Sequence, residues 1–217
     1  MKQIIIRHSD YSFFCFDFDG VILDTIDLKA EGFAHAFGKL SDNQLLEILE
    51  YQKKNGGQDR INKFIHLSQL IGREEPSSEK LEALSTRLTE YVLGGIERAP
   101  YIEGFLEFLE KAQDLEMPCA IASAMPQLEL HEILNFLGIK SHFKVAYGMP
   151  VPKVENLATI KDALTTEQKP GLYFGDTLSD FDAAQKSGLD FLGIGKNEAF
   201  DPMLIKSAIN FLDVALN

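Results

Sequence analysis

The sequence has only two cysteines among its 217 residues, and its basic residues are outnumbered by acidic ones. Cys15 and Cys119 both lie in apolar runs, so we expect two buried, reduced thiols in a cytoplasmic protein. The two cysteines are also too far apart in the sequence to form a Cys-x-x-Cys type of metal-binding motif. With 21 basic and 33 acidic residues, the net charge is −12, which makes a nucleic-acid backbone or an anionic membrane a poor partner.

Long hydrophobic runs are also missing. Ile4, Ile5 and Ile6 are the only consecutive apolar residues before Arg7, which is too few for the hydrophobic region of a signal peptide. No apolar run approaches the length of a membrane span. A content of 45% hydrophobic and 25% charged residues is ordinary for a globular chain long enough for one core and a smaller second one. Because no long exposed apolar stripe demands a partner, we expect a soluble, cytoplasmic monomer.

The most informative stretch is FFCFDFDGVILDT, from Phe13 to Thr25. Its apolar start is typical of a central parallel strand that is buried on both faces. Gly20 tolerates a positive φ and therefore permits a sharp turn after that strand. Asp17 and Asp19 would then lie at the carboxyl end of the strand, where open α/β sheets bind their ligands. The alternative is that these aspartates only cap a helix or stabilise a turn.

Residues 26 to 95 have the periodicity of four amphipathic helices. Helix-breaking residues separate these helices at Gly38 and Ser41, at residues 55–57 and at residues 72–78. The apolar positions are Leu28, Phe33, Ala36 and Phe37; Leu45, Leu46, Ile48 and Leu49; Ile61, Phe64, Ile65, Leu67 and Leu70; and Leu81, Leu84, Leu88, Tyr91 and Val92. We therefore expect a helical domain over residues 25–95, with Gly94 and Gly95 as the return hinge, inserted into a core domain of residues 1–24 and 96–217.

From Pro100 onward the pattern alternates between helix and strand, which predicts an α/β fold with a doubly wound parallel sheet. The tail from Pro202 is expected to form a helix, or an edge strand. The other expected helices cover residues 102–115, 126–137, 153–164 and 179–188, and the expected strands cover residues 119–122, 143–146, 171–175 and 191–194.

Further polar residues follow these later strands. Ser123 ends one strand, Asp176 ends another with Asp180 four residues on, and Lys153 begins the helix between them. Because the carboxyl ends of parallel strands meet at one edge of a sheet, these groups can converge with Asp17 although they are far apart in sequence. In isolation, a serine after a strand is usually a helix cap and a lysine at a helix start is usually solvated.

Four segments in this order resemble the motifs of the haloacid dehalogenase-like superfamily of phosphatases and phosphomutases. They are DFDGVILDT, Ser123 in AIASA, Lys153 in VPKVENL, and GDTLSD from Gly175 to Asp180. The resemblance covers nearly the whole chain and includes the inserted helices, as in the phosphoglycolate phosphatase and β-phosphoglucomutase branch. It implies a Rossmann-like core with a helical cap, and an enzyme that acts on a small phosphorylated metabolite. A local lysine and a metal ion can overrule the acidic net charge for such a ligand.

The resemblance also implies roles for the carboxylates. Asp17 would attack phosphorus to form an aspartyl-phosphate, and Asp19 would protonate the leaving oxygen and then accept a proton from water. Mg²⁺ would be held by Asp17 and Asp176 with the main-chain carbonyl of Asp19, because this ion prefers oxygen ligands. Asp180 would either hold a water next to the metal or orient Lys153.

Ser123 and Ala124 would contact the phosphoryl group, and Lys153 would supply fixed positive charge to it. In the cap, Gly57 and Arg60 resemble the Gly-x-x-Arg loop by which helical caps reach substrate, although Arg60 could equally form a surface pair.

Two observations bear on the type of reaction. Asp19 argues against the dehalogenases of the superfamily, which use no acid at this position. Lys29 stands where the phosphomutase branch often has a histidine, which weakens the mutase interpretation without excluding it, and we expect Lys29 to be solvated. We therefore predict a Mg²⁺-dependent phosphatase, with a phosphomutase as the alternative and a catalytically silent binding domain as a third, less favoured hypothesis.

Overall fold

The computed structural model describes residues 3–55, 59–166 and 169–217. The chain divides into two compact units, one formed by Met1–Asp24 with Tyr101–Asn217 and the other by Thr25–Pro100. The smaller unit therefore ends at Pro100, five residues beyond Gly95. Gly94 and Gly95 themselves lie in the last turn of helix α4 (Ser78–Gly95), and a short 3₁₀ helix, Ile96–Arg98, follows it.

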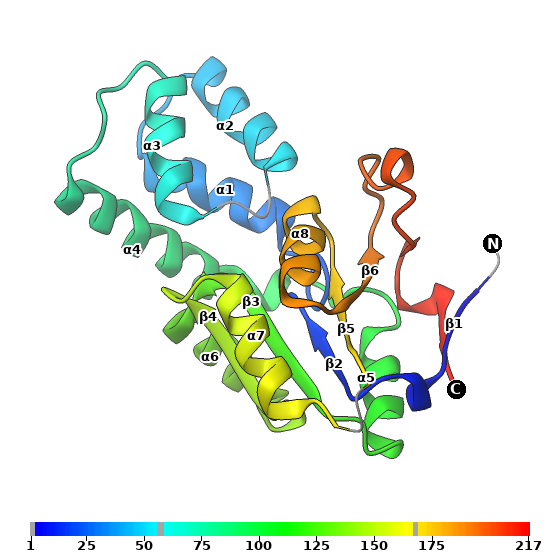
Figure 1. Cartoon of the computed structure of the whole chain (residues 1–217). Helices are drawn as coiled ribbons and strands as arrows, with labels where there is room; N and C mark the ends of the chain where they lie inside the picture. The colour runs from blue at the N-terminus through cyan, green and yellow to red at the C-terminus, as the bar shows by residue number, and fades with distance from the viewer. Residues whose placement is uncertain (1–2, 56–58, 167–168) are drawn as a thin grey trace. The chain divides into compact units, whose positions relative to one another are not determined.

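The larger unit is built on a six-stranded sheet in the order β4-β3-β2-β5-β6-β7 (Figure 1). All neighbouring strands are parallel, and each is joined to the next in sequence by a crossover, so the predicted doubly wound α/β fold is confirmed. The strands are β2 (Phe13–Phe16), β3 (Cys119–Pro126), β4 (Val145–Met149), β5 (Gly171–Gly175), β6 (Asp190–Ile194) and β7 (Ser207–Ala208). The helices are α5 (Phe105–Asp114), α6 (Gln127–Phe136), α7 (Lys153–Leu164) and α8 (Leu178–Ser187).

Strand β2 is central and is buried on both faces, as its apolar sequence predicts. On one face, Phe13 and Cys15 pack in a core cluster with residues of α7 and α8. On the other face, Phe16 stacks on Phe174 of β5, with ring centroids 4.8 Å apart, and meets Phe105 of α5 edge to face. These aromatic contacts hold β2 and β5 together directly beneath the point where both strands end in aspartates.

The ends of the chain depart from the expected pattern. Strand β1 (Ile4–Ile6) pairs in parallel with β8 (Val214–Leu216) in a second, two-stranded sheet; neither β1 nor this second sheet was expected. The expected tail helix is wrong, because the tail contains only the short 3₁₀ helices Asp201–Met203 and Phe211–Asp213. The alternative edge strand is confirmed as β7. Strands this short carry too few residues to show a period.

Strand β3, beside the central strand, and the edge strand β4 are displaced from their expected bounds. Strand β3 continues past Ala122 to Pro126, with a register shift against β4 between those two residues. The start of β4 moves from Phe143 to Val145. The side chain of Gln127 accepts a 2.7 Å hydrogen bond from the Gly148 N–H, which fastens the end of β4 to the start of α6. A side-chain bond of this kind leaves no trace in the hydrophobic pattern.

The smaller unit contains the four predicted helices, α1 (Ile26–Ala36), α2 (Asp42–Lys54), α3 (Arg60–Leu70) and α4. The starts of α2, α3 and α4 are capped by Ser41, Asp59 and Ser77, each of which accepts a hydrogen bond from a backbone N–H in the first turn. Phe33 of α1 packs against Phe64 of α3 with ring centroids 4.8 Å apart. Among the helices in the described ranges, none is long and apolar enough to cross a membrane.

Candidate active site

Asp17 lies one residue beyond β2, and its backbone N–H donates a 2.8 Å hydrogen bond to the carbonyl of Phe174 on β5. Only 5% of the residue is exposed. Its Oδ2 is 3.1 Å from the Nζ of Lys153. Its Oδ1 is buried and has no hydrogen-bond partner within the described parts of the chain. A buried carboxylate oxygen without a donor is costly, so this atom marks a position where a positively charged or hydrogen-bonding group is needed.

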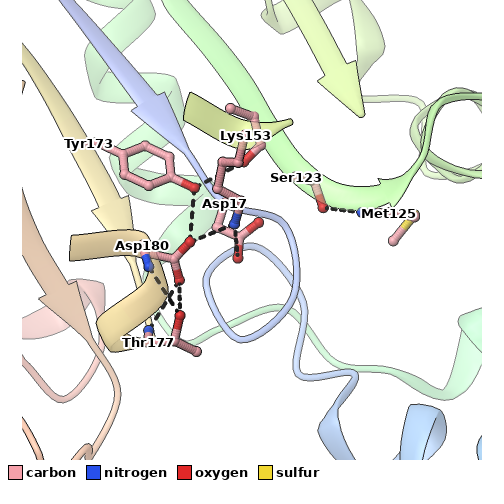
Figure 2. A network of polar contacts seen from close by, with 8 residues as sticks. Asp17, Ser123, Met125, Lys153, Tyr173, Thr177 and Asp180 are labelled. Atoms are coloured by element: carbon pink, nitrogen blue, oxygen red, sulfur yellow. Dashed lines mark hydrogen bonds and ion pairs between the residues drawn. The ribbon is translucent and has the colours of Figure 1, made fainter. Parts of the chain in front are cut away.

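Lys153, the first residue of α7, bridges two carboxylates (Figure 2). Its Nζ is 2.5 Å from Oδ1 of Asp180, in addition to its 3.1 Å contact with Asp17. Burial alone would lower the pKa of Lys153, but the negative charges of Asp17 and Asp180 outweigh burial and raise it. The ammonium is therefore charged at neutral pH.

Asp180 is fully buried in the first turn of α8, and both of its oxygens accept hydrogen bonds. Oδ2 accepts from the hydroxyl of Thr177 at 2.6 Å and from its backbone N–H at 3.1 Å, which forms a reciprocal capping box. Oδ1 accepts from Lys153 and, at 3.2 Å, from the hydroxyl of Tyr173. Burial raises the pKa of Asp180, but the charge of Lys153 and these hydrogen bonds outweigh burial and lower it.

Asp176 follows β5 directly, and its carboxylate lies against the backbone of Gly20. Gly20 has φ +74°, and a Cβ added there would overlap Oδ2 of Asp176. The main-chain carbonyl of Asp176 accepts a 2.9 Å hydrogen bond from the side-chain amide of Asn197. Burial, followed by the charges of Asp180 and Asp17, raises the pKa of Asp176 well above its usual value.

The pKa of Asp17 is also raised, to about 7. Burial is the main cause; Lys153 opposes it, and the negative charges of Asp180 and Asp19 add to it. Burial and the neighbouring carboxylates thus disfavour the ionised forms of Asp17 and Asp176, and one lysine does not compensate for this.

The three carboxylates fit a divalent cation. One oxygen each of Asp17, Asp176 and Asp180 lies within 4.8 Å of the others. The unpartnered Oδ1 of Asp17 agrees with such a site, and an all-oxygen donor set suits Mg²⁺. The sequence predicted the carboxylates of Asp17 and Asp176 with the main-chain carbonyl of Asp19 as ligands; the cluster consists of side chains and adds Asp180. Because both oxygens of Asp180 already accept hydrogen bonds, Asp17 and Asp176 have the greater need of a cation.

Asp19 lies in the turn that follows Asp17. The turn is closed by hydrogen bonds from the Gly20 N–H to the Leu23 carbonyl at 2.8 Å and from the Ile22 N–H to the Phe18 carbonyl at 2.9 Å. Asp19 is half-buried, so a partly water-accessible carboxyl stands two residues from the buried Asp17.

Ser123 is buried, and its Oγ accepts a 3.2 Å hydrogen bond from the backbone N–H of Met125. Figure 2 shows its side chain pointing toward Met125, whereas Asp17, Lys153, Tyr173 and Asp180 point toward one another. Strand β3 is next to β2, and Ser123 was expected to end it, but Ser123 and the half-buried Ala124 lie within β3, beyond its last residue paired with β2, Ile121. Among the described residues, however, no hydrogen bond joins Ser123 to Asp17 or Lys153.

In the helical unit, Arg60 begins α3, and its Nη1 donates to the hydroxyl of Thr89 at 2.7 Å and to that of Ser85 at 3.5 Å. Both partners are on α4, so this guanidinium bonds within its own unit. Gly57, its predicted companion, lies outside the described residues. Lys29 is half-buried in the first turn of α1, and its backbone N–H bonds to the Thr25 carbonyl.

Three residues that contact the predicted ones were not anticipated from the sequence. Tyr173 lies in an apolar run, so its sequence context indicates only an ordinary residue of the hydrophobic core. Thr177 could have been found, because Thr-x-x-Asp is the spacing of a capping box. Asn197 lies 21 residues beyond Asp176 in a loop with no recognisable pattern.

The sequence matches a family model described as haloacid dehalogenase-like hydrolase over residues 14–194. The chain therefore belongs to this family of hydrolases, as its four motifs predicted, and it is an enzyme. Comparison with curated proteins finds no match.

Solved structures of the same fold cover almost the whole chain. A CbbY mutant from Rhodobacter sphaeroides, in complex with xylulose-1,5-bisphosphate, is 13% identical with a TM-score of 0.79, over 95% of this chain and 97% of that one. β-Phosphoglucomutase from Clostridium difficile is 18% identical with a TM-score of 0.73, over 92% and 91%. A predicted phosphatase from Clostridium acetobutylicum is 16% identical with a TM-score of 0.73, over 95% and 94%. At these identities the likeness shows the fold.

Proposed function

We propose that the chain is a Mg²⁺-dependent phosphatase that hydrolyses a small phosphomonoester through an aspartyl-phosphate on Asp17. The observation that carries this proposal is the position of Asp17, with Oδ2 beside Lys153 and Oδ1 buried without a partner at the carboxyl end of the central strand. Membership of the hydrolase family and the phosphatases among proteins of the same fold support it.

Asp17 acts as the nucleophile. Its carboxylate oxygen forms a bond to phosphorus as the bond from phosphorus to the leaving alkoxide breaks, and water later cleaves the aspartyl-phosphate to release inorganic phosphate. Attack requires the ionised carboxylate. Lys153 stabilises that form, and it is placed to stabilise the charge that develops on the phosphoryl oxygens.

Asp19 acts as the general acid and base. It donates a proton to the leaving oxygen in the first step and accepts one from the attacking water in the second. Its place in the half-buried turn after Asp17 gives it access to water, which the second step needs.

Asp17 and Asp176 would hold Mg²⁺, together with the main-chain carbonyl of Asp19, while Asp180 stays with Lys153 and Thr177. When bound, the ion would offset the repulsion between a phosphate dianion and these carboxylates. The Asn197 amide keeps the Asp176 backbone in place by its hydrogen bond to the carbonyl.

The remaining predicted residues would select the substrate. Ser123 and Ala124, in the part of β3 that extends beyond its pairing with β2, would bind phosphoryl oxygens, which requires the Ser123 hydroxyl to turn its proton outward while its oxygen keeps the Met125 N–H. The helical unit would act as the cap, with Arg60 and Gly57 as its substrate-facing residues.

A phosphomutase is the second candidate. β-Phosphoglucomutase and CbbY have the same fold, and in such a reaction a sugar hydroxyl would replace water in the second step. Lys29, in place of the histidine expected for that branch, favours the phosphatase.

The test is Mg²⁺-dependent release of phosphate from a panel of sugar, nucleotide and small-acid phosphates, together with a search for isomerised sugar phosphates. Asp17→Asn removes the nucleophile and is expected to abolish release. Asp182→Asn is the matched control, because Asp182 is exposed on the same helix as Asp180 and its loss should leave release unchanged. Release that persists in Asp17→Asn contradicts the nucleophile assignment, and isomerisation without release favours the mutase.

A further inference from the structure

The side chain of Tyr173 passes over the central strand. Tyr173 is the middle residue of β5 and pairs in register with Cys15 of β2, which in turn pairs with Ala120 of β3. Its hydroxyl nevertheless donates a 2.9 Å hydrogen bond to the carbonyl of Ala122, which is on β3. Because β2 lies between β5 and β3, the tyrosine reaches across β2. Cys15 belongs to the same buried cluster, and its small side chain leaves room for the ring.

The hydroxyl of Tyr173 is shared between two acceptors of the candidate site. It is 2.9 Å from the Ala122 carbonyl, which directly precedes Ser123, and 3.2 Å from Oδ1 of Asp180. A phenol has one proton, so it donates to one of these oxygens at a time. A buried hydroxyl destabilises an apolar core unless it is bonded, and a phenylalanine would fill the same space without that requirement. The hydroxyl therefore has a use beyond packing.

Tyr173 is also the donor that connects the Asp180–Lys153 pair to the sheet. Thr177, which donates to Asp180, stands at the start of the same helix and moves with it. Lys153 approaches from α7 on a long, flexible side chain. Tyr173, by contrast, is fixed in β5, and its ring centroid lies 5.9 Å from the Lys153 Nζ (Figure 2).

We propose that Tyr173 is a positioning residue that holds Asp180, and through it Lys153, at the correct place beside Asp17. This inference rests on the proposed function, because Lys153 matters there as the cation that faces the phosphoryl group. Without the hydroxyl, Asp180 keeps the Thr177 bonds but loses its link to the sheet, and the Lys153 ammonium loses its fixed distance from Asp17.

The test is binding of inorganic phosphate in the presence of Mg²⁺, measured by ³¹P NMR titration, which tolerates the high phosphate concentrations that weak variants need. Tyr173→Phe removes only the hydroxyl. Tyr147→Phe is the matched control: Tyr147 packs against the same cluster from β4, and its hydroxyl makes no hydrogen bond within the described ranges. Both substitutions are made in the wild type and in Lys153→Met, and circular dichroism verifies the fold of each variant.

We expect Tyr173→Phe to weaken phosphate binding about tenfold in the wild type, as for a lost bond to a charged group, and to have no effect in Lys153→Met. Tyr147→Phe should leave both backgrounds unchanged. An equal loss in both backgrounds would show a packing role and overturn the inference, as would unaltered binding in Tyr173→Phe. If the wild type itself does not bind phosphate, the proposed function is overturned, and this inference with it.

Discussion

Lys153→Met is the perturbation that tests the electrostatics of the site most sharply. Methionine keeps the length and apolar stem of lysine but removes the ammonium that lies 3.1 Å from Asp17 and 2.5 Å from Asp180. Both partners are buried, so the two carboxylates are left facing each other without a cation. Removing one partner of a buried ion pair typically costs about 3–5 kcal/mol, and we expect a loss of that size in the free energy of unfolding.

The loss should depend on pH. Asp17 already has a raised pKa of about 7, and the charge of Lys153 lowers the pKa of both carboxyls, so removing Lys153 raises the pKa of Asp17 further and reverses the lowering of the pKa of Asp180. A carboxyl with a raised pKa in the folded state binds more protons there than when unfolded, so its contribution to stability falls as pH rises through the window between the two values. In the wild type, the lowered pKa of Asp180 acts in the opposite direction. The difference in the free energy of unfolding between Lys153→Met and the wild type is therefore small near about pH 4 and largest above about pH 7.

The assay is urea unfolding without Mg²⁺ at several pH values. Lys161→Met is the matched control, because Lys161 is on the same helix but donates to an uncharged acceptor, the Ser187 carbonyl, at 3.0 Å. That control should lose only about 1 kcal/mol, with little dependence on pH. A loss in Lys153→Met no larger than in the control, or one that does not grow with pH, would refute the argument that Lys153 neutralises two buried carboxylates.

Three further predictions follow from the same geometry. Protons compete with Mg²⁺ for Asp17, whose pKa is about 7, so isothermal calorimetry should find Mg²⁺ bound about tenfold more weakly near pH 6 than near pH 8; equal affinities contradict this. Gly20→Ala places a Cβ at φ +74° against the Asp176 carboxylate, so it should lower the free energy of unfolding by at least about 1 kcal/mol and weaken Mg²⁺ binding. Gly38→Ala is the control: Gly38 has the same φ and open space around it, so this substitution should lower the free energy of unfolding only by the backbone strain. Phe16→Ala should lower the free energy of unfolding by about 3–5 kcal/mol, because the ring is fully buried between α5 and β5; a loss below about 1 kcal/mol contradicts its central place in the core.

The sheet and its reactive edge were predictable because their signals are local. The apolar run of β2 ends in Asp17, β5 ends in Asp176, and both follow from strand patterns read directly from the chain. The four helices of the smaller unit were predictable for the same reason, because each apolar period is separated from the next by helix-breaking residues and by capping residues such as Ser41 and Ser77.

The contacts within the site were not predictable. The reach of Tyr173 across β2 depends on strand order and on a small residue at Cys15, neither of which is a local property. The hydrogen bond from Asn197 to Asp176 joins two loops that the sheet brings together. The pairing of β1 with β8 likewise joins the two ends of the chain through strands of only three residues.

The central claim is that Asp17 carries the phosphoryl group during turnover. It is tested most directly by quenching the enzyme during turnover of its best substrate, reducing the acyl-phosphate with borohydride, and locating the modified residue by tandem mass spectrometry. The account predicts reduction at Asp17, dependent on substrate and absent from Asp17→Asn. Modification at Asp19 or Asp176, or continued turnover with no modified aspartate, would contradict it.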